Sequence, residues 1–286
     1  MTATDLPAMP LDADAAIRGI AGLPSLPATV LEILQCLNDD DIDTDTLAHK
    51  IAADQALVAR MLRVANSPFY GLRGRVNSIQ DAIVVLGLRS VRMLASAAAV
   101  AHALKRLSTP EFSYASFLRH SVATALGARL LAKRCRQHEE IAFLAGLLHD
   151  IGRLALASCF PAHFAAVRRY RDQTDCQLLD AERLVLGLDH ARLGHLLAEH
   201  WGFPPALCEA IGSHHGCEDE ALTLGNLVQV ADAIVHALDL AEDDTEMAPR
   251  IAPCCWSNVG LAWHDSQALF QEIERQFADL GDLLAG

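Results

Sequence analysis

Apolar residues recur along this chain with the three- and four-residue spacing of successive amphipathic helices. Ser78 is typical of a helix N-cap and Gly87 of a helix end, and residues 79–86 between them carry an apolar face. Residues 88–106 are rich in alanine and predict a long core helix. No alternation of apolar and polar positions in the sequence is long enough to build a sheet. The pattern therefore predicts an all-α protein.

A cluster of Ser, Thr and Pro at residues 107–110 indicates a boundary within this series of helices. We expect a flexible segment over 1–19, where Pro and Asp interrupt the pattern, and an N-terminal helical part over 20–107. A helical core over 108–240 and an acidic loop with further helices over 241–286 follow. The helices expected beyond the boundary are 112–134, 139–159, 162–172, 176–186, 190–200, 205–214, 220–238 and 266–283.

The composition indicates a folded protein with an acidic surface. Of 286 residues, 52% are hydrophobic and 21% charged, which is typical of a globular protein. The formal net charge is -13, so the chain as a whole repels phosphate backbones, although a small basic patch can still bind an anion. Direct binding of nucleic acid is therefore disfavoured.

The compartment is expected to be the cytoplasm, with no membrane association. The first sixteen residues lack the basic and apolar pattern of a signal peptide, and the weakly charged stretch 94–104 is too short to span a bilayer. Eight cysteines occur without C-x-x-C spacing, which indicates reduced thiols. The adjacent Cys254 and Cys255 leave a metal or redox element as an alternative.

A set of histidines and aspartates on different predicted helices forms the candidate site. Asp150 and Asp232 carry the most weight, because a carboxylate in an apolar helix is unfavourable unless it is paired or ligated. Nitrogen and oxygen ligands of this kind bind divalent metals, and helix bundles build such sites from inward-facing side chains. The candidate ligands are His120, His149, Asp150, His190, His214, His215 and Asp232.

The seven residues suit a two-metal arrangement in which Asp150 bridges the ions. The first ion would be bound by His120, His149 and Asp232. The second ion would be bound by His190, His214 and His215. Such ions lower the pKa of a shared water, which then attacks a phosphorus atom. Arg153 would bind the phosphate as a fork, so Asp150 and Arg153 are the candidate catalytic residues.

The alternative is that these residues do not converge and form a polar relic in a helical interaction module. A single histidine on a helix is more often structural than a ligand, and thirteen histidines allow a chance constellation. His195 and His200 lie close to the set in sequence and illustrate this. The histidines expected to be structural or exposed are His49, His102, His138, His163, His236 and His264.

The string from Gly146 to Arg153, with His120 upstream, resembles the HD superfamily of metal-dependent phosphohydrolases. Further stretches over roughly residues 20–240 resemble the HDOD family within it: Leu26-Pro27, Asp54 to Leu57, Asn66 to Gly71, Ser78 to Gly87, Phe143 to Arg153 and His190 to Trp201. The resemblance implies a multi-helix HD core with an additional N-terminal helical subdomain. It also implies a bacterial signal-transduction module that regulates by protein–protein interaction.

The implied partners are signalling proteins with receiver, diguanylate cyclase or phosphodiesterase domains, and apolar helices near the C-terminus leave a homodimer open. Most HDOD proteins have lost several HD ligands, whereas this chain keeps candidates for all of them. We therefore expect one or two divalent ions, with Fe or Mn favoured and Zn or Mg as alternatives. The alternative function is a metal-dependent phosphohydrolase acting on a nucleotide or cyclic dinucleotide.

Two departures from the related HD-GYP branch weigh against hydrolysis of cyclic di-GMP. The pair His214-His215 resembles that branch, but residues 216–219 replace its Gly-Tyr-Pro segment. Arg153 also stands where an HD-GYP enzyme usually has lysine.

Overall fold

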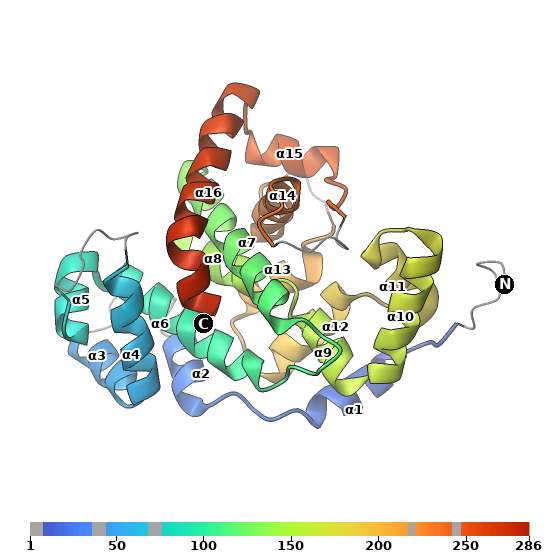
Figure 1. Cartoon of the computed structure of the whole chain (residues 1–286), viewed down its shortest axis with the longest axis horizontal. Helices are drawn as coiled ribbons and strands as arrows, with labels where there is room; N and C mark the ends of the chain where they lie inside the picture. The colour runs from blue at the N-terminus through green and yellow to red at the C-terminus, as the bar shows by residue number, and fades with distance from the viewer. Residues whose placement is uncertain (1–7, 36–43, 68–75, 217–220, 242–246, 286) are drawn as a thin grey trace.

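The computed structural model describes residues 8–35, 44–67, 76–216, 221–241 and 247–285, and among these all regular secondary structure is helical (Figure 1). The prediction of an all-α protein is confirmed. The helices are α1 (Ala13–Ala21), α2 (Ala28–Gln35), α3 (Thr44–Ala52), α4 (Gln55–Ala65), α5 (Ile79–Leu86), α6 (Leu88–Lys105), α7 (Tyr114–Arg134), α8 (Glu139–Leu148), α9 (Ile151–Cys159), α10 (Pro161–Thr174), α11 (Leu178–Leu186), α12 (His190–His200), α13 (Pro205–Ser213), α14 (Leu224–Ala237), α15 (Pro253–Val259) and α16 (Trp263–Ala285).

Helices α3, α4 and α5 gather at one end of the molecule, and α6 leads from them into the core (Figure 1). The alanine-rich middle of α6 is buried on all sides, as its composition predicts. A buried ion pair joins α6 to the core, because Arg92 Nε lies 2.8 Å from Glu140 Oε2 on α8. Helix α6 therefore packs against α2, α4 and α5 as well as against α8 of the core.

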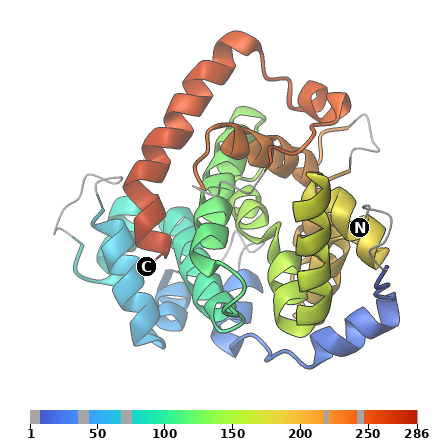
Figure 2. The same ribbon diagram turned by 45° about the vertical axis from the view of Figure 1, so that its right-hand side comes forward.

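The core is built on α7, which packs against α8, α14 and α16. Figure 2 shows α16 running as a long helix over the outside of this group. Small residues allow the close approach of the inner helices. A Cβ atom added to Gly146 would lie 2.7 Å from the Cα of Ala125, and one added to Gly127 would lie 3.2 Å from the Cβ of Ala231. These contacts bring the histidine-bearing ends of α7, α8 and α14 together.

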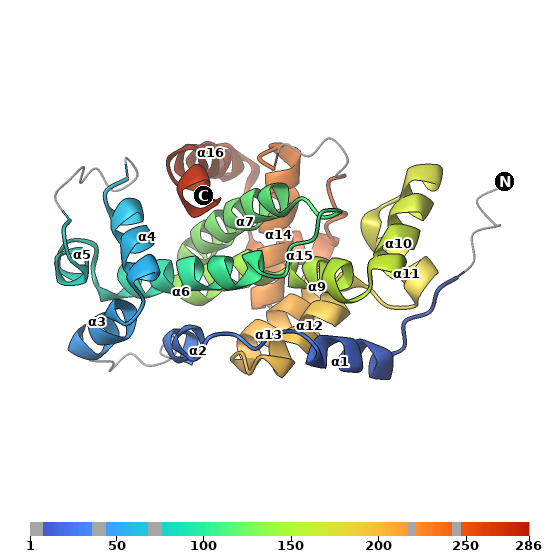
Figure 3. The ribbon, with the colours of Figure 1, turned by 60° about the horizontal axis from the view of Figure 1, so that its bottom comes forward.

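The prediction of a flexible segment over residues 1–19 is wrong for its second half, because residues 13–21 form α1. Asp12 caps this helix by accepting a hydrogen bond of 2.6 Å from the Ala15 amide. The amides of Met9 and Leu11 donate to the carbonyls of Val185 and Leu186 at the end of α11. Figure 3 shows α1 lying along the underside of the core, and it packs against α12 and α9.

The single helix predicted over 139–159 is in fact two helices. α8 ends at Leu148, α9 begins at Ile151, and His149 and Asp150 form the turn between them. The apolar periodicity continues across this turn without a proline, which is why the sequence pattern does not reveal the break. The stretch Glu139–Cys159 is apolar and long enough to cross a membrane, yet 83% of its most apolar window is buried inside this protein.

The C-terminal part and the cysteines also differ from expectation. The short helix α15 was not predicted, and α16 begins at Trp263 rather than at 266. Cys254 is disulfide-bonded, so the prediction of reduced thiols is wrong for this residue. Five other cysteines among the described residues are free: Cys135, Cys159, Cys176, Cys208 and Cys255.

We predict that Gly152→Ala destabilises the protein strongly. A Cβ atom at this position would lie 1.9 Å from the His190 carbonyl oxygen and 2.6 Å from the Gly194 nitrogen. Both obstacles are backbone, so α9 and α12 would have to separate, at a loss of about 3 kcal/mol or more of unfolding free energy. Urea unfolding with a chelator present measures this loss. Gly216→Ala is the control, because its Cβ would meet only an ordinary contact of 3.6 Å; equal losses would contradict the prediction.

Candidate metal centre

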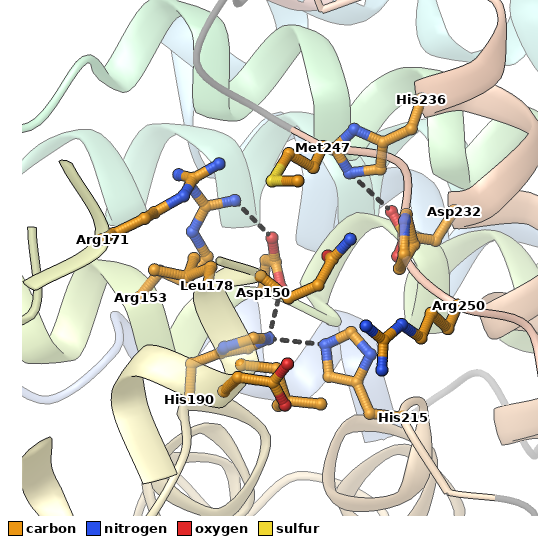
Figure 4. Close-up of a pocket in the computed structure, with 14 residues that line it drawn as sticks. Asp150, Arg153, Arg171, Leu178, His190, His215, Asp232, His236, Met247 and Arg250 are labelled. Atoms are coloured by element: carbon orange, nitrogen blue, oxygen red, sulfur yellow. Dashed lines mark hydrogen bonds and ion pairs between the residues drawn. The ribbon is translucent and has the colours of Figure 1, made fainter. Parts of the chain in front are cut away.

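The buried carboxylate of Asp150 is surrounded by imidazoles (Figure 4). Its Oδ1 lies 3.2 Å from Nε2 of His190 and 3.6 Å from Nε2 of both His149 and His214. Its Oδ2 accepts a hydrogen bond of 3.0 Å from Nη1 of Arg153. One carboxylate therefore faces three ring nitrogens from three parts of the chain.

Asp232 on α14 forms a second focus next to the first. Its Oδ1 lies 2.9 Å from Nε2 of His120 and 3.7 Å from Nε2 of His149. A third ring nitrogen, Nε2 of His236, is 3.3 Å from the same oxygen. His236 was expected to be structural or exposed, and this expectation needs correction. The spacing signal was present, because residues four apart on a helix share one face.

All seven candidate ligands converge, so the alternative of scattered histidines is wrong. His215 joins through its Nε2, which lies 2.8 Å from Nε2 of His190. Three groups offer ligand atoms within 4.8 Å of one another: Asp150 with His190, His214 and His215; His120 with His149 and Asp150; His120 with Asp232 and His236. The first group is the predicted second ion site, while His236 joins the part assigned to the other ion.

The hydrogen bonds of the histidines orient their Nε2 lone pairs toward the cluster. Nδ1 of His149 donates to the Gly146 carbonyl at 2.8 Å, and Nδ1 of His214 donates to the Ile211 carbonyl at 2.7 Å. A carbonyl only accepts, so Nδ1 carries a proton and Nε2, the nitrogen that a neutral ring offers as a ligand, faces the cluster. Nε2 of His214 is buried and has no hydrogen-bond partner. A divalent cation among these nitrogens and carboxylates would satisfy it, so the residues fit a metal.

Glu182 fixes His190 from behind. Its Oε2 accepts hydrogen bonds from Nδ1 of His190 at 2.6 Å and from the His190 backbone amide at 2.9 Å. Asp189 caps α12 through the Arg192 amide, which places His190 at the first position of the helix. The sequence analysis missed Glu182, although the rule used for Asp232 applies to it, since it is a carboxylate buried in an apolar helix.

The electrostatics favour ionised carboxylates and divide the rings, because the pKa of His120, His214 and His215 is lowered whereas that of His149 and His190 is raised. Burial acts to raise the pKa of the Asp150 carboxyl, but the imidazoles and the guanidinium around it hold that pKa well below its usual range. Burial and the neighbouring His214 and His190 hold the pKa of His215 well below its usual value. For His190, Glu182 and Asp150 overcome burial and raise the pKa. A metal that binds His190 must therefore displace a tightly held proton.

A pocket opens over Asp150 and Asp232, and three arginines line it. Arg153 comes from α9, Arg171 from α10, and Arg250 from the segment before α15 (Figure 4). A neighbouring cavity shares Arg153 and Arg171 with this pocket and adds the phenylalanine rings of Phe112, Phe117 and Phe164. The pocket thus gives a ligand access to the His/Asp cluster from a side that carries three arginines.

The HDOD domain family model matches residues 23–217, more than half of the chain. The chain belongs to the HDOD family. An HDOD protein of Geobacter sulfurreducens, of unknown function, has the same fold with a TM-score of 0.79, 24% identity and coverage of 96% of this chain and 98% of that one. A Shewanella amazonensis SB2B protein, provisionally named a phosphohydrolase, gives a TM-score of 0.75, 29% identity and coverage of 94% and 98%.

Among curated relatives of this HDOD protein, a Treponema pallidum protein without known function is 25% identical over 81% of this chain. Ribonuclease Y of Desulforudis audaxviator is 34% identical over 128 residues, or 45% of this chain. The HDOD chain spans 45% of the length of the first relative and 20% of the second. Asp232, His236 and Arg250 lie beyond the residues that the family model matches.

We predict that Glu182→Gln weakens metal binding while the protein stays folded. The amide no longer supplies the charge that orients His190 and strengthens its Nε2 as a ligand, so affinity should fall by about 10- to 100-fold. Titration of the metal-free protein with Mn²⁺ measures the change. Glu199→Gln is the matched control, because this exposed carboxylate lies 3.3 Å from His195 outside the cluster. Equal affinity in both variants would contradict the prediction.

We predict that His236→Ala lowers the metal content of the protein. The ring nitrogen beside Asp232 completes one of the ligand groups, so its removal should release about one equivalent of metal. Elemental analysis after gel filtration measures the content. His163→Ala on α10 serves as the control, since this ring packs against Phe160 away from the cluster. Unchanged metal content would return His236 to a structural role.

Proposed function

We propose that this HDOD protein is a metal-dependent phosphohydrolase within a signal-transduction family. The observation that carries the proposal is the convergence of imidazole nitrogens and carboxylates around Asp150 and Asp232, with a pocket lined by arginines above them. The ribonuclease Y relatives and the Shewanella protein support the same class of chemistry by their names.

The residues have distinct roles in this proposal. His120, His149, Asp150 and Asp232 would hold one ion together with His236, while His190, His214 and His215 share Asp150 to hold the other. When bound, such ions polarise a phosphoryl group and make water nucleophilic at neutral pH. Glu182 keeps the His190 ring in the ligand orientation. Arg153, next to Asp150 at the pocket floor, binds phosphoryl oxygens through its planar fork of N–H groups.

Burial of the cluster also contributes to the chemistry. His149, His190 and His214 are 1%, 4% and 0% exposed, so water reaches the carboxylates mainly through the pocket. Charges act more strongly on one another in such a site than in bulk water, because few solvent dipoles screen them. The negative charge of a substrate phosphate would therefore interact strongly with the ions and with the arginines of the pocket.

We predict that the purified protein binds Fe or Mn and hydrolyses phosphoesters, and that His149→Ala/Asp150→Ala abolishes both properties. The double variant removes the shared carboxylate and one of its imidazoles. Elemental analysis is followed by a screen with bis(p-nitrophenyl) phosphate, nucleoside monophosphates and cyclic dinucleotides.

Asp172→Asn, at an exposed position on α10, is the control and should keep metal and turnover. A protein that takes up one or two equivalents of metal but hydrolyses nothing in the screen would refute catalysis. It would favour the regulatory role through protein partners. A protein that takes up no metal would refute the metal site itself.

A further inference from the structure

One wall of the pocket comes from residues 247–250, which lie beyond the family match. Met247, Pro249 and Arg250 line the pocket, and Figure 4 shows Arg250 on the side of Asp232 and His215, opposite Arg153 and Arg171. The segment is tied to the start of α11, because Nε2 of Gln177 donates to the Ala248 carbonyl at 3.2 Å. The hydrogen bond holds this wall in place across the pocket.

The positive charge on this wall has no ion-pair partner among the described residues. Arg250 is exposed and makes no ion pair with any described residue, whereas Arg153 is paired with Asp150. Of the acidic side chains that line the pocket, Asp150 and Asp232 belong to the metal cluster, which leaves Asp180 alone. An acidic chain with a net charge of -13 thus presents cationic groups on two sides of one opening.

We propose that the substrate is a phosphoester with a second anionic group, which Arg250 binds while the first phosphate sits at the metal cluster. This inference rests on the proposed function, because it assigns the first phosphate to that site. A lone phosphate occupies the space beside Arg153 and leaves Arg250 in water. A second phosphate on the same molecule reaches the opposite wall, where a guanidinium offers charge-assisted, bidentate hydrogen bonds. Arg250 is therefore a specificity-determining residue.

The test compares adenosine 5′-monophosphate with adenosine 3′,5′-bisphosphate, which differ only in the second phosphate. Calorimetric titration of the Mn²⁺-loaded protein gives both affinities without requiring turnover. The wild-type protein should bind the bisphosphate about tenfold more tightly, the gain expected from one charge-assisted contact at an exposed site. Arg250→Gln should remove this preference and leave the affinity for the monophosphate unchanged.

Arg169→Gln is the matched control, because it removes the same charge from an exposed position on α10 outside the pocket. The control should keep the preference, which separates a local contact from the general effect of charge. Equal affinities of the wild-type protein for the two nucleotides, or a preference that survives in Arg250→Gln, would overturn the inference. A preference lost only in Arg250→Gln, in a protein without turnover, supports it and refutes catalysis alone.

Discussion

The buried carboxylate of Asp150 is the constraint around which the rest of this structure is arranged. A charge 4% exposed inside a helical core is strongly unfavourable unless other groups compensate it. Here a guanidinium and three imidazoles do so, and each imidazole is held by a hydrogen bond on its far side. Side chains from several helices thus stabilise one negative charge. This arrangement is expected of a cation site rather than of a structural core.

Close helix packing makes this arrangement possible. The turn at His149 and Asp150 separates α8 from α9, so both side chains can point to the same side. Gly152 then lets α9 touch the backbone at His190, which brings that ring within reach of Asp150. A side chain at either glycine of this contact, Gly152 or Gly194, would push α12 away from the carboxylate. Backbone proximity, and not loop flexibility, therefore determines the distances within the cluster.

The candidate site was predictable where burial conflicts with charge. Asp150 and Asp232 stand out as carboxylates in apolar surroundings, and this signal led to the ligands on neighbouring helices. The same reasoning overlooked Glu182 and His236, although the rule for buried carboxylates applies to Glu182 and the four-residue spacing from Asp232 applies to His236. The break at His149 and the packing of α1 were also beyond the sequence pattern, since both depend on contacts with distant helices. Periodicity reports what faces a core, whereas tertiary contacts decide where a helix stops.

The spread of the ligands along the chain has a consequence for folding. The cluster joins α7, the α8–α9 turn, α12, the end of α13 and α14, so an ion bound there would cross-link segments from His120 to His236. An ion that binds only the folded protein stabilises it in proportion to the logarithm of its free concentration, by about 2.7 kcal/mol when that concentration is about 100 times Kd. An ion that leaves on unfolding would act as a reversible clasp. The core would then unfold most cooperatively when the ion is bound. The availability of metal in the cell would set the free energy of unfolding of this group of helices.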